Sequence, residues 1–406
     1  MDNTGFLQIN VTNNLNVPIE NAVINLSYEG RPEEVIRVLD TDSSGQTENV
    51  QLEAPPVELS RTEDNIVMPY AEYSIYVTAE GYEPVDVSGI EILSETSSQQ
   101  NVKLTAIGEG QEIVIPAHTL YGYYPPKIAE AEIKPTNEAG EIVLSRVVVP
   151  ETIVVHDGSP SDSTAKNYYV PYTDYIKNVA SSEIYATWSD ATITANVLAI
   201  MSFTLNRVYT EWYRNKGYDF TITSSTAYDH KWIYGRNIYD NISDIVDEIF
   251  DQYIARPDVK QPILTQYCDG RRVTCPNWLS QWGSKDLGDR GYSPIEILRY
   301  YYGDDIYLRT AEAISGIPSS WPGYDLTIGS RGDKVRQLQE ELDIIAEVYS
   351  SIPRIAADGI FGNNTKAAVL AFQKIFGLPQ TGSVDFRTWY KISQIYVGIT
   401  RIAELS

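Results

Sequence analysis

One carboxyl group stands out among the residues of this chain that could do chemistry. Glu183 lies seven residues after Ile176 and four after Val179, a spacing that places all three on one face of a helix. Apolar surroundings favour the neutral form of a carboxyl group, because desolvation penalises the charged form. A general acid needs this property near neutral pH. The spacing therefore makes Glu183 a candidate general acid, and it leaves open the simpler alternative of a residue at a helix end that faces solvent or pairs with an arginine.

Aromatic residues crowd the sequence around Glu183, in a chain that contains 30 tyrosines. Aromatic faces stack on sugar rings, although packing in the core is the commoner role of any single one. We predict that five of these residues contribute to a sugar-binding surface: Tyr168, Tyr169, Tyr172, Tyr185 and Trp188.

Residues that could bind a metal are scarce, since the chain has three histidines and two cysteines. His230, Cys268 and Cys275 together would supply three zinc ligands, but His230 is more simply an ordinary core or surface residue. For the cysteines we favour two free or incidentally paired thiols, and a disulfide is the main alternative. We accordingly expect no metal and no cofactor.

The elements that must position these residues form a mixed α/β module at residues 151–320. The spacing of apolar residues predicts a helix that is capped by Thr173 and runs to Ile184, and a longer helix that follows Asp190. A further helix is predicted to open at Pro294, because proline is tolerated in a first turn. Glu183 would then lie at the end of the first of these helices.

Two segments precede this module. Residues 1–106 carry short runs of alternating apolar residues between turn clusters, which predicts a small β-sandwich. The Gly-Tyr-Glu-Pro run at 81–84 makes it resemble the transthyretin-like and carboxypeptidase-regulatory sandwiches. Residues 107–150 contain five prolines and four glycines, so we expect an extended connector with a strand or two.

Charge and composition exclude several kinds of partner. The net charge of −24 repels phosphate backbones, so we expect no nucleic acid. The chain has no apolar run long enough to span a membrane, so we expect no membrane insertion. The first residues lack the basic and apolar regions of a secretory signal peptide, so if the protein works on a cell wall, we expect it to arrive without that signal.

Several runs of the central module follow one another in a characteristic order: 175–184, Trp188, 195–203, 279–283 and 291–303. In that order they resemble the SpoIID/LytB family of lytic transglycosylases, an α+β fold. The resemblance implies that Glu183 is the catalytic glutamate of a non-hydrolytic reaction. It would cleave the bond between N-acetylmuramic acid and N-acetylglucosamine and leave a 1,6-anhydro ring. Asn196 and Met201 depart from the glutamine and arginine that are usual in the family.

Residues 325–396 are predicted to form three small helices around one core. Their turns and apolar positions, from Gly329 through Asp358–Gly362 to Trp389, resemble the peptidoglycan-binding domain-1 family. All four segments in this order resemble the clostridial spore cortex-lytic enzymes. This likeness implies a precursor in the spore that a subtilisin-like protease activates at germination. We expect the cut between Lys127 and Pro150, where exposed loops admit proteases.

Two other functions stay open from the sequence. An N-acetylmuramoyl-L-alanine amidase would release stem peptides and leave the glycan strands intact. A non-catalytic wall-binding or spore-structural protein would keep the fold without chemistry. Glu183 argues against the second alternative, because a scaffold has no need of a carboxyl group on a buried helix face.

Overall fold

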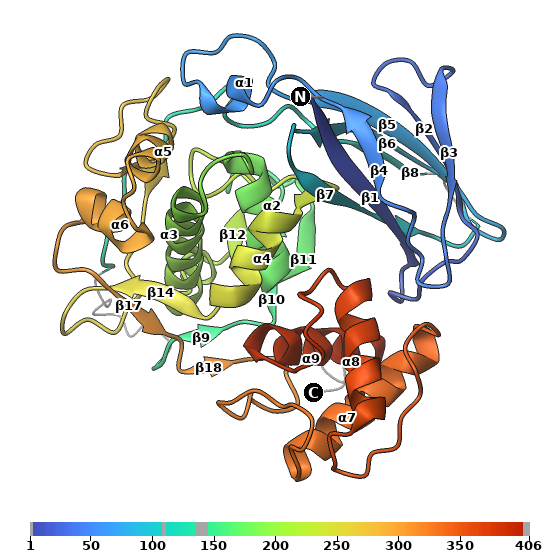
Figure 1. Cartoon of the computed structure of the whole chain (residues 1–406). Helices are drawn as coiled ribbons and strands as arrows, with labels where there is room; N and C mark the ends of the chain where they lie inside the picture. Colours follow the sequence, from blue (N-terminus) through green and yellow to red (C-terminus); the bar gives the residue numbers. More distant parts are fainter. Residues whose placement is uncertain (1–2, 108–110, 135–144, 401–406) are drawn as a thin grey trace.

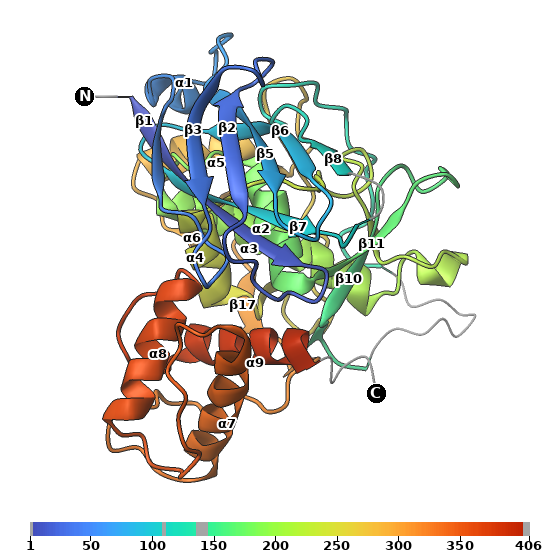
Figure 2. The same ribbon diagram turned by 90° about the vertical axis from the view of Figure 1, so that its right-hand side faces the viewer.

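The computed structural model describes residues 3–107, 111–134 and 145–400, which fold into three packed bodies (Figures 1 and 2). The first consists of two β-sheets, the second is a mixed α/β module, and the third is built from helices. Each body has its own cluster of buried apolar residues. The prediction of a multidomain chain is therefore confirmed.

Two sheets form the N-terminal body. One has the strand order β13-β7-β1-β4 and contains β1 (Thr4–Asn13), β4 (Val50–Glu53), β7 (Ser97–Leu104) and β13 (Ile238–Tyr239). The other has the order β3-β2-β5-β6-β8 and contains β2 (Val23–Tyr28), β3 (Val35–Asp40), β5 (Ala71–Thr78), β6 (Val85–Ile92) and β8 (Gln111–Val114). A single helical turn, α1 (Glu58–Arg61), separates β4 from β5.

Alternation along the strands builds the core of this body. Leu7, Ile9 and Val11 of β1 are fully buried, while the residues between them are partly exposed, as a half-buried strand requires. The boundary predicted at residue 106 is wrong, because β8 lies beyond it and pairs with β6. The central module also contributes β13, which pairs with β7. Strands this short carry no periodicity of their own in the sequence.

The central module surrounds one long helix. Its strands are β9 (Val148–Val149), β10 (Thr152–His156), β11 (Asn167–Pro171), β12 (Ile222–Thr223), β14 (Gln252–Ala255), β15 (Tyr267–Cys268), β16 (Leu279–Ser280), β17 (Tyr307–Thr310) and β18 (Ala313–Ile314). Its helices are α2 (Tyr172–Glu183), α3 (Asp190–Tyr209), the 3₁₀ turn η1 (Arg214–Lys216), α4 (Asp240–Ile249), α5 (Gln281–Asp289) and α6 (Pro294–Tyr302). Helix α3 is buried on nearly all sides, and buried polar side chains such as Asn196 and Arg207 have hydrogen-bond partners.

The two helices that frame Glu183 start differently from one another. Helix α2 begins at Tyr172 after Pro171, so the predicted cap at Thr173 is wrong and that residue lies inside the first turn. Helix α3 is capped by Ser189, whose hydroxyl accepts a hydrogen bond from the Thr192 amide. Helix α2 ends at Glu183, one residue before the predicted end at Ile184.

The predicted connector also packs differently from expectation. Residues 118–134, which we call the strap, run across the central module, and Leu120, Tyr124 and Lys127 are buried. Proline and glycine keep this segment free of helix, but they do not make it a loose link. The backbone amide of Ile128 donates to the Ala227 carbonyl at 2.7 Å, so the strap is part of the packed structure.

Three helices form the C-terminal body: α7 (Asp333–Val348), α8 (Asn363–Ile375) and α9 (Phe386–Thr400). Two buried glutamines repeat one arrangement. The side-chain oxygen of Gln339 accepts from the Gly359 amide at 2.8 Å, and that of Gln373 accepts from the Gly382 amide at 2.9 Å. The side-chain amide of Gln339 also donates to the Thr365 hydroxyl. These turn and helix residues therefore hold the loops in place.

The first and last bodies also touch each other, as both views show (Figures 1 and 2). The Gln46 side-chain amide donates to the Ile375 carbonyl at 2.7 Å, and the hydroxyls of Ser43 and Ser351 lie 2.9 Å apart. The C-terminal body thus contacts the sandwich as well as the central module. Over the described residues, no helix is both long enough and apolar enough to cross a membrane.

Candidate active site

The Glu183 side chain lies at the end of α2 and is fully buried. One carboxylate oxygen accepts a hydrogen bond from the backbone amide of Lys231 at 2.5 Å, and the other accepts from the Tyr267 hydroxyl. The Glu183 carbonyl accepts from the Gln281 side-chain amide at 3.2 Å. Both ends of this residue are therefore fixed, which holds the carboxyl group in one orientation.

Burial raises the pKa of the Glu183 carboxyl above its usual range. The positive charge of Lys127, the Lys231 amide and the Tyr267 hydroxyl act in the opposite direction, because each favours the carboxylate. Burial in turn lowers the pKa of Lys127 to about 8, although the Glu183 and Asp229 charges oppose this. Glu183 is thus shifted towards the protonated form that a general acid uses.

The Lys231 amide, one of the two donors to Glu183, lies in a loop that is held by a buried network around Asp229. Its carboxylate accepts from Arg207 at 2.8 Å, from the Tyr213 hydroxyl at 2.7 Å and from the Thr223 hydroxyl at 2.6 Å. This network fixes the loop that contains Lys231. Sequence patterns alone did not indicate it, because its members come from separate segments.

His230 belongs to the same cluster but shows no arrangement of metal ligands. Its ring stacks on Tyr267 with 5.7 Å between centroids, and its Nδ1 lies 2.9 Å from the Tyr175 hydroxyl. Cys268 and Cys275 form a disulfide with Cα atoms 5.6 Å apart, so our preference for unlinked or only incidentally paired thiols is corrected. Within the described residues, no group of three or more potential ligands is clustered.

The five aromatic residues predicted to bind sugar do not share one surface. Tyr185 and Trp188 are buried and pack with Trp282, while Tyr168 packs against other aromatic rings. Their role in binding sugar stays a prediction, and the five rings are not presented together. The reason is that residues close in sequence around a helix end point into different layers of the core.

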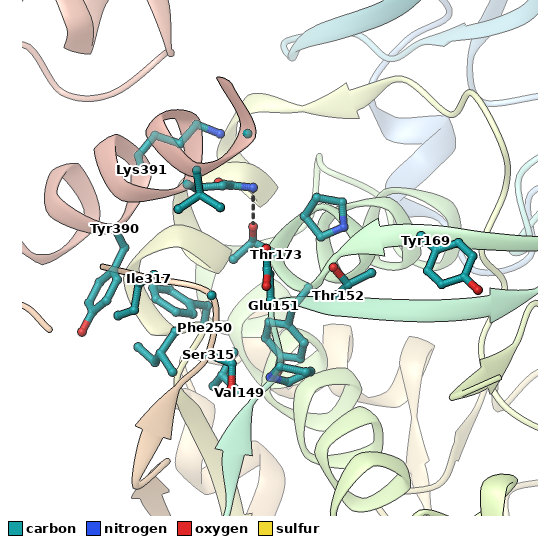
Figure 3. Close-up of a pocket in the computed structure, with 18 of the residues that line it drawn as sticks. Val149, Glu151, Thr152, Tyr169, Thr173, Phe250, Ser315, Ile317, Tyr390 and Lys391 are labelled. Carbon is teal, nitrogen blue, oxygen red and sulfur yellow. Dashed lines mark hydrogen bonds between the residues drawn. The ribbon is translucent and has the colours of Figure 1, made fainter. Parts of the chain in front are cut away.

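Tyr169 and Tyr172 lie instead at a cavity of about 350 Å³ between α9 and the central module. Figure 3 shows Tyr390 and Lys391 of α9 on one side of it, and Thr152 and Tyr169 of the central module on the other. Tyr169 is 74% exposed. Glu183 is not among the described residues that line this cavity, so the candidate acid and this cavity are separate features.

Two residues beside Glu183 were not predicted from the sequence. Tyr124 and Lys127 of the strap are buried, and the Glu183 charge acts on both. The Lys127 ammonium lies 4.2 Å from the centre of the Tyr267 ring and donates to the Asp229 carbonyl at 2.5 Å. Both residues fall in the proline-rich segment that we interpreted as a connector, and no residue pattern there indicates that it packs near Glu183.

Comparisons with known proteins identify the C-terminal body. Residues 331–392 match the family model titled "Putative peptidoglycan binding domain". A zinc D-Ala-D-Ala carboxypeptidase from Streptomyces albus G is 41% identical over 76 residues, which are 19% of this chain and 28% of that protein. The prediction of a C-terminal peptidoglycan-binding domain, with peptidoglycan as partner, is confirmed at this level. Because the chain spans only 28% of that relative, the relative's activity is not transferred to it.

Solved structures resemble parts of the chain. The N-terminal domain of SleB is 27% identical, covers 19% of this chain and 99% of that domain, and has a TM-score of 0.17. Catechol 1,2-dioxygenase from Acinetobacter is 13% identical, covers 26% of this chain and 54% of that one, and has a TM-score of 0.19. We draw no argument from scores this low.

Proposed function

We propose that this protein is a peptidoglycan lytic transglycosylase in which Glu183 is both acid and base. The observation that carries the proposal is the fixed, buried Glu183 carboxyl, whose pKa is raised by burial. The groups that act on it are cations and hydrogen-bond donors. A glycoside hydrolase usually needs a second carboxylate for water or for a covalent intermediate, whereas a transglycosylase of this kind needs one.

The reaction balances with this one residue. The Glu183 carboxylic acid gives its proton to the glycosidic oxygen between N-acetylmuramic acid and N-acetylglucosamine as the bond to C1 breaks. The C6 hydroxyl oxygen of the same muramoyl residue then bonds to C1, and its proton passes to the Glu183 carboxylate. The acid is restored, a 1,6-anhydro ring forms, and no water is consumed.

The spore is the proposed setting. By its order of segments the chain resembles the clostridial spore cortex-lytic enzyme SleC, so we infer a precursor that a subtilisin-like germination protease cuts between Lys127 and Pro150. Part of that range, 135–144, lies outside the described residues. Ser145 and Arg146 beyond it are exposed, which suits cleavage nearby.

The test is the product released from purified cortex peptidoglycan by protein cut with a subtilisin-type protease. Mass spectrometry should find anhydro-muropeptides; freed stem peptides would indicate an amidase instead, and no product a non-catalytic protein. Glu183→Gln should lower the rate on short soluble glycans by about 10² or more, a typical loss for general acid–base catalysis. Glu341→Gln is the matched control, because Glu341 is a buried glutamate of raised pKa in the C-terminal body. Equal rates for the two variants would reject Glu183 as the catalytic acid and base.

A further inference from the structure

We propose that the strap, residues 118–134, is the element that closes the Glu183 site in the uncut chain. The inference rests on the proposed function. Its first support is burial: Glu183 has no exposed surface, and the strap places the Lys127 ammonium 4.2 Å from the centre of the Tyr267 ring, whose hydroxyl donates to Glu183. A catalytic carboxyl has to meet a glycan chain, so some segment must move before reaction. The strap occupies the position of that segment.

The upstream half of the strap is bound beside the end of α2. The Thr119 amide donates to the Ser182 carbonyl, one residue before Glu183, at 3.2 Å. The Arg272 guanidinium donates to three successive strap carbonyls, at Thr119, Leu120 and Tyr121. Arg272 lies inside the loop closed by the disulfide, which gives the loop a role in holding the strap.

The downstream half is bound through charged side chains. Both carboxylate oxygens of Glu130 accept from Arg207, at 2.6 and 2.9 Å. Burial alone would raise the pKa of Glu130, but the bonds from Arg207 and Lys134 outweigh it and hold the pKa at about 2. The strap therefore completes the network that also orients Asp229 and, through its loop, the donor to Glu183.

The strap buries polar groups that have few hydrogen-bond partners, which favours its release. The buried Lys127 ammonium has a backbone carbonyl as its hydrogen-bond acceptor, and the Tyr124 hydroxyl has no hydrogen-bond partner among the described residues. Burying polar groups with incomplete partners is unfavourable. The closed contact is therefore stabilised by less free energy than an apolar contact of the same size would be. Its polar groups form hydrogen bonds with water when the strap is released. The β-sandwich makes its own contacts further along, where Ser60 bonds the Thr187 hydroxyl at 2.7 Å.

The strap also lies on the correct side of the proposed cut. A cut beyond Lys134, before the central module begins, leaves the whole strap on the N-terminal piece. That piece can then carry Tyr124 and Lys127 away from Glu183. A cut at Lys127 itself would divide the strap, so the inference narrows the expected cleavage to the segment after Lys134.

The experiment loosens the strap in the uncut chain without touching Glu183 or its donors. Arg272→Ala removes its three carbonyl contacts, and Arg354→Ala, which breaks an exposed ion pair in the C-terminal body, is the control. Two readouts are taken: labelling of Glu183 by a carbodiimide and an amine, located by mass spectrometry, and release of anhydro-muropeptides from cortex. Both rates should rise at least about tenfold in Arg272→Ala, or about 1.4 kcal/mol, and stay unchanged in the control.

The two readouts separate the possible failures. Faster labelling without anhydro-muropeptides would support closure of the site by the strap and reject the proposed transglycosylase function. Unchanged labelling in a folded Arg272→Ala chain would overturn the proposal that the strap closes the Glu183 site. If that variant does not fold, hydrogen exchange on the wild type decides: the amides of Thr119, Ile128 and Glu130 should lose protection when the chain is cut and becomes active. Continued protection of these amides in fully active protein would also overturn the strap.

Discussion

Removing the hydroxyl of Tyr267 tests the Glu183 site most directly. In Tyr267→Phe the Glu183 carboxyl loses the hydrogen bond from the tyrosine hydroxyl, while the bond from the Lys231 backbone amide stays in place. A hydrogen bond contributes about 1.5–3 kcal/mol to a charged group and about 0.5–1.5 kcal/mol to a neutral one. The charged form therefore loses about 1–1.5 kcal/mol more than the neutral form. At about 1.36 kcal/mol per pKa unit, the pKa of Glu183 rises by about one unit.

The assay is the pH dependence of kcat/KM for the cut enzyme on soluble glycan. An acid works only while protonated, so kcat/KM falls as the pH rises through the pKa of Glu183. In Tyr267→Phe this fall should move up by about one pH unit. Tyr302→Phe is the control, since Tyr302 is a buried tyrosine whose hydroxyl donates to the Gln266 carbonyl at 2.8 Å. A fall that stays in place, moves to lower pH, or moves equally in both variants would refute the reasoning.

Three further outcomes follow from the structure. Truncation after Ser320 should weaken sedimentation with insoluble peptidoglycan far more than turnover on short soluble glycans, because tethering raises the local substrate concentration; equal retention on sacculi would contradict it. Cys268→Ser with Cys275→Ser should lower the free energy of unfolding by about 2.5 kcal/mol, from the entropy of the short loop, and keep turnover without added metal, which chelation can check. The free energy of unfolding of the uncut chain should rise relative to that of Lys127→Met between about pH 8 and about pH 10. The reason is that the pKa of Lys127 is about 8 in the folded chain, below its unfolded value, so the unfolded chain binds more protons in this range. Denaturant unfolding at several pH values measures this difference.

Helical spacing predicted the elements around Glu183 because the information is local. Ile176 and Val179 define a face, and a residue four positions on must share it, so the burial of Glu183 follows from the sequence. The turns of the C-terminal body are equally local: Gly359 and Gly382 each donate to a glutamine of the preceding helix. Such patterns are legible without the rest of the chain.

The strap was misjudged because its contacts are not local. Arg272 binds carbonyls about 150 residues earlier in the chain, and backbone carbonyls have no sequence signature. Glu130 forms an ion pair with Arg207 on another element, and no residue pattern in the proline-rich segment predicts this ion pair. The aromatic residues around Glu183 do not share one surface, and here the reason is local. Tyr169 and Tyr185 are close in sequence, but one is exposed and the other is buried, because a strand and a helix end direct them apart.

The contact between the first and last bodies bears on how far the proposed enzyme can work from its anchor. In the uncut chain the peptidoglycan-binding domain is bonded to the sandwich through Gln46 and Ser43. Departure of the sandwich leaves that domain with the packing of α9 on the central module and the link at residues 315–332. An enzyme anchored to an insoluble polymer reaches only the bonds within the length of its tether. The proposed cut would therefore also lengthen the tether, and each anchored molecule would reach glycan bonds over a larger area of the wall.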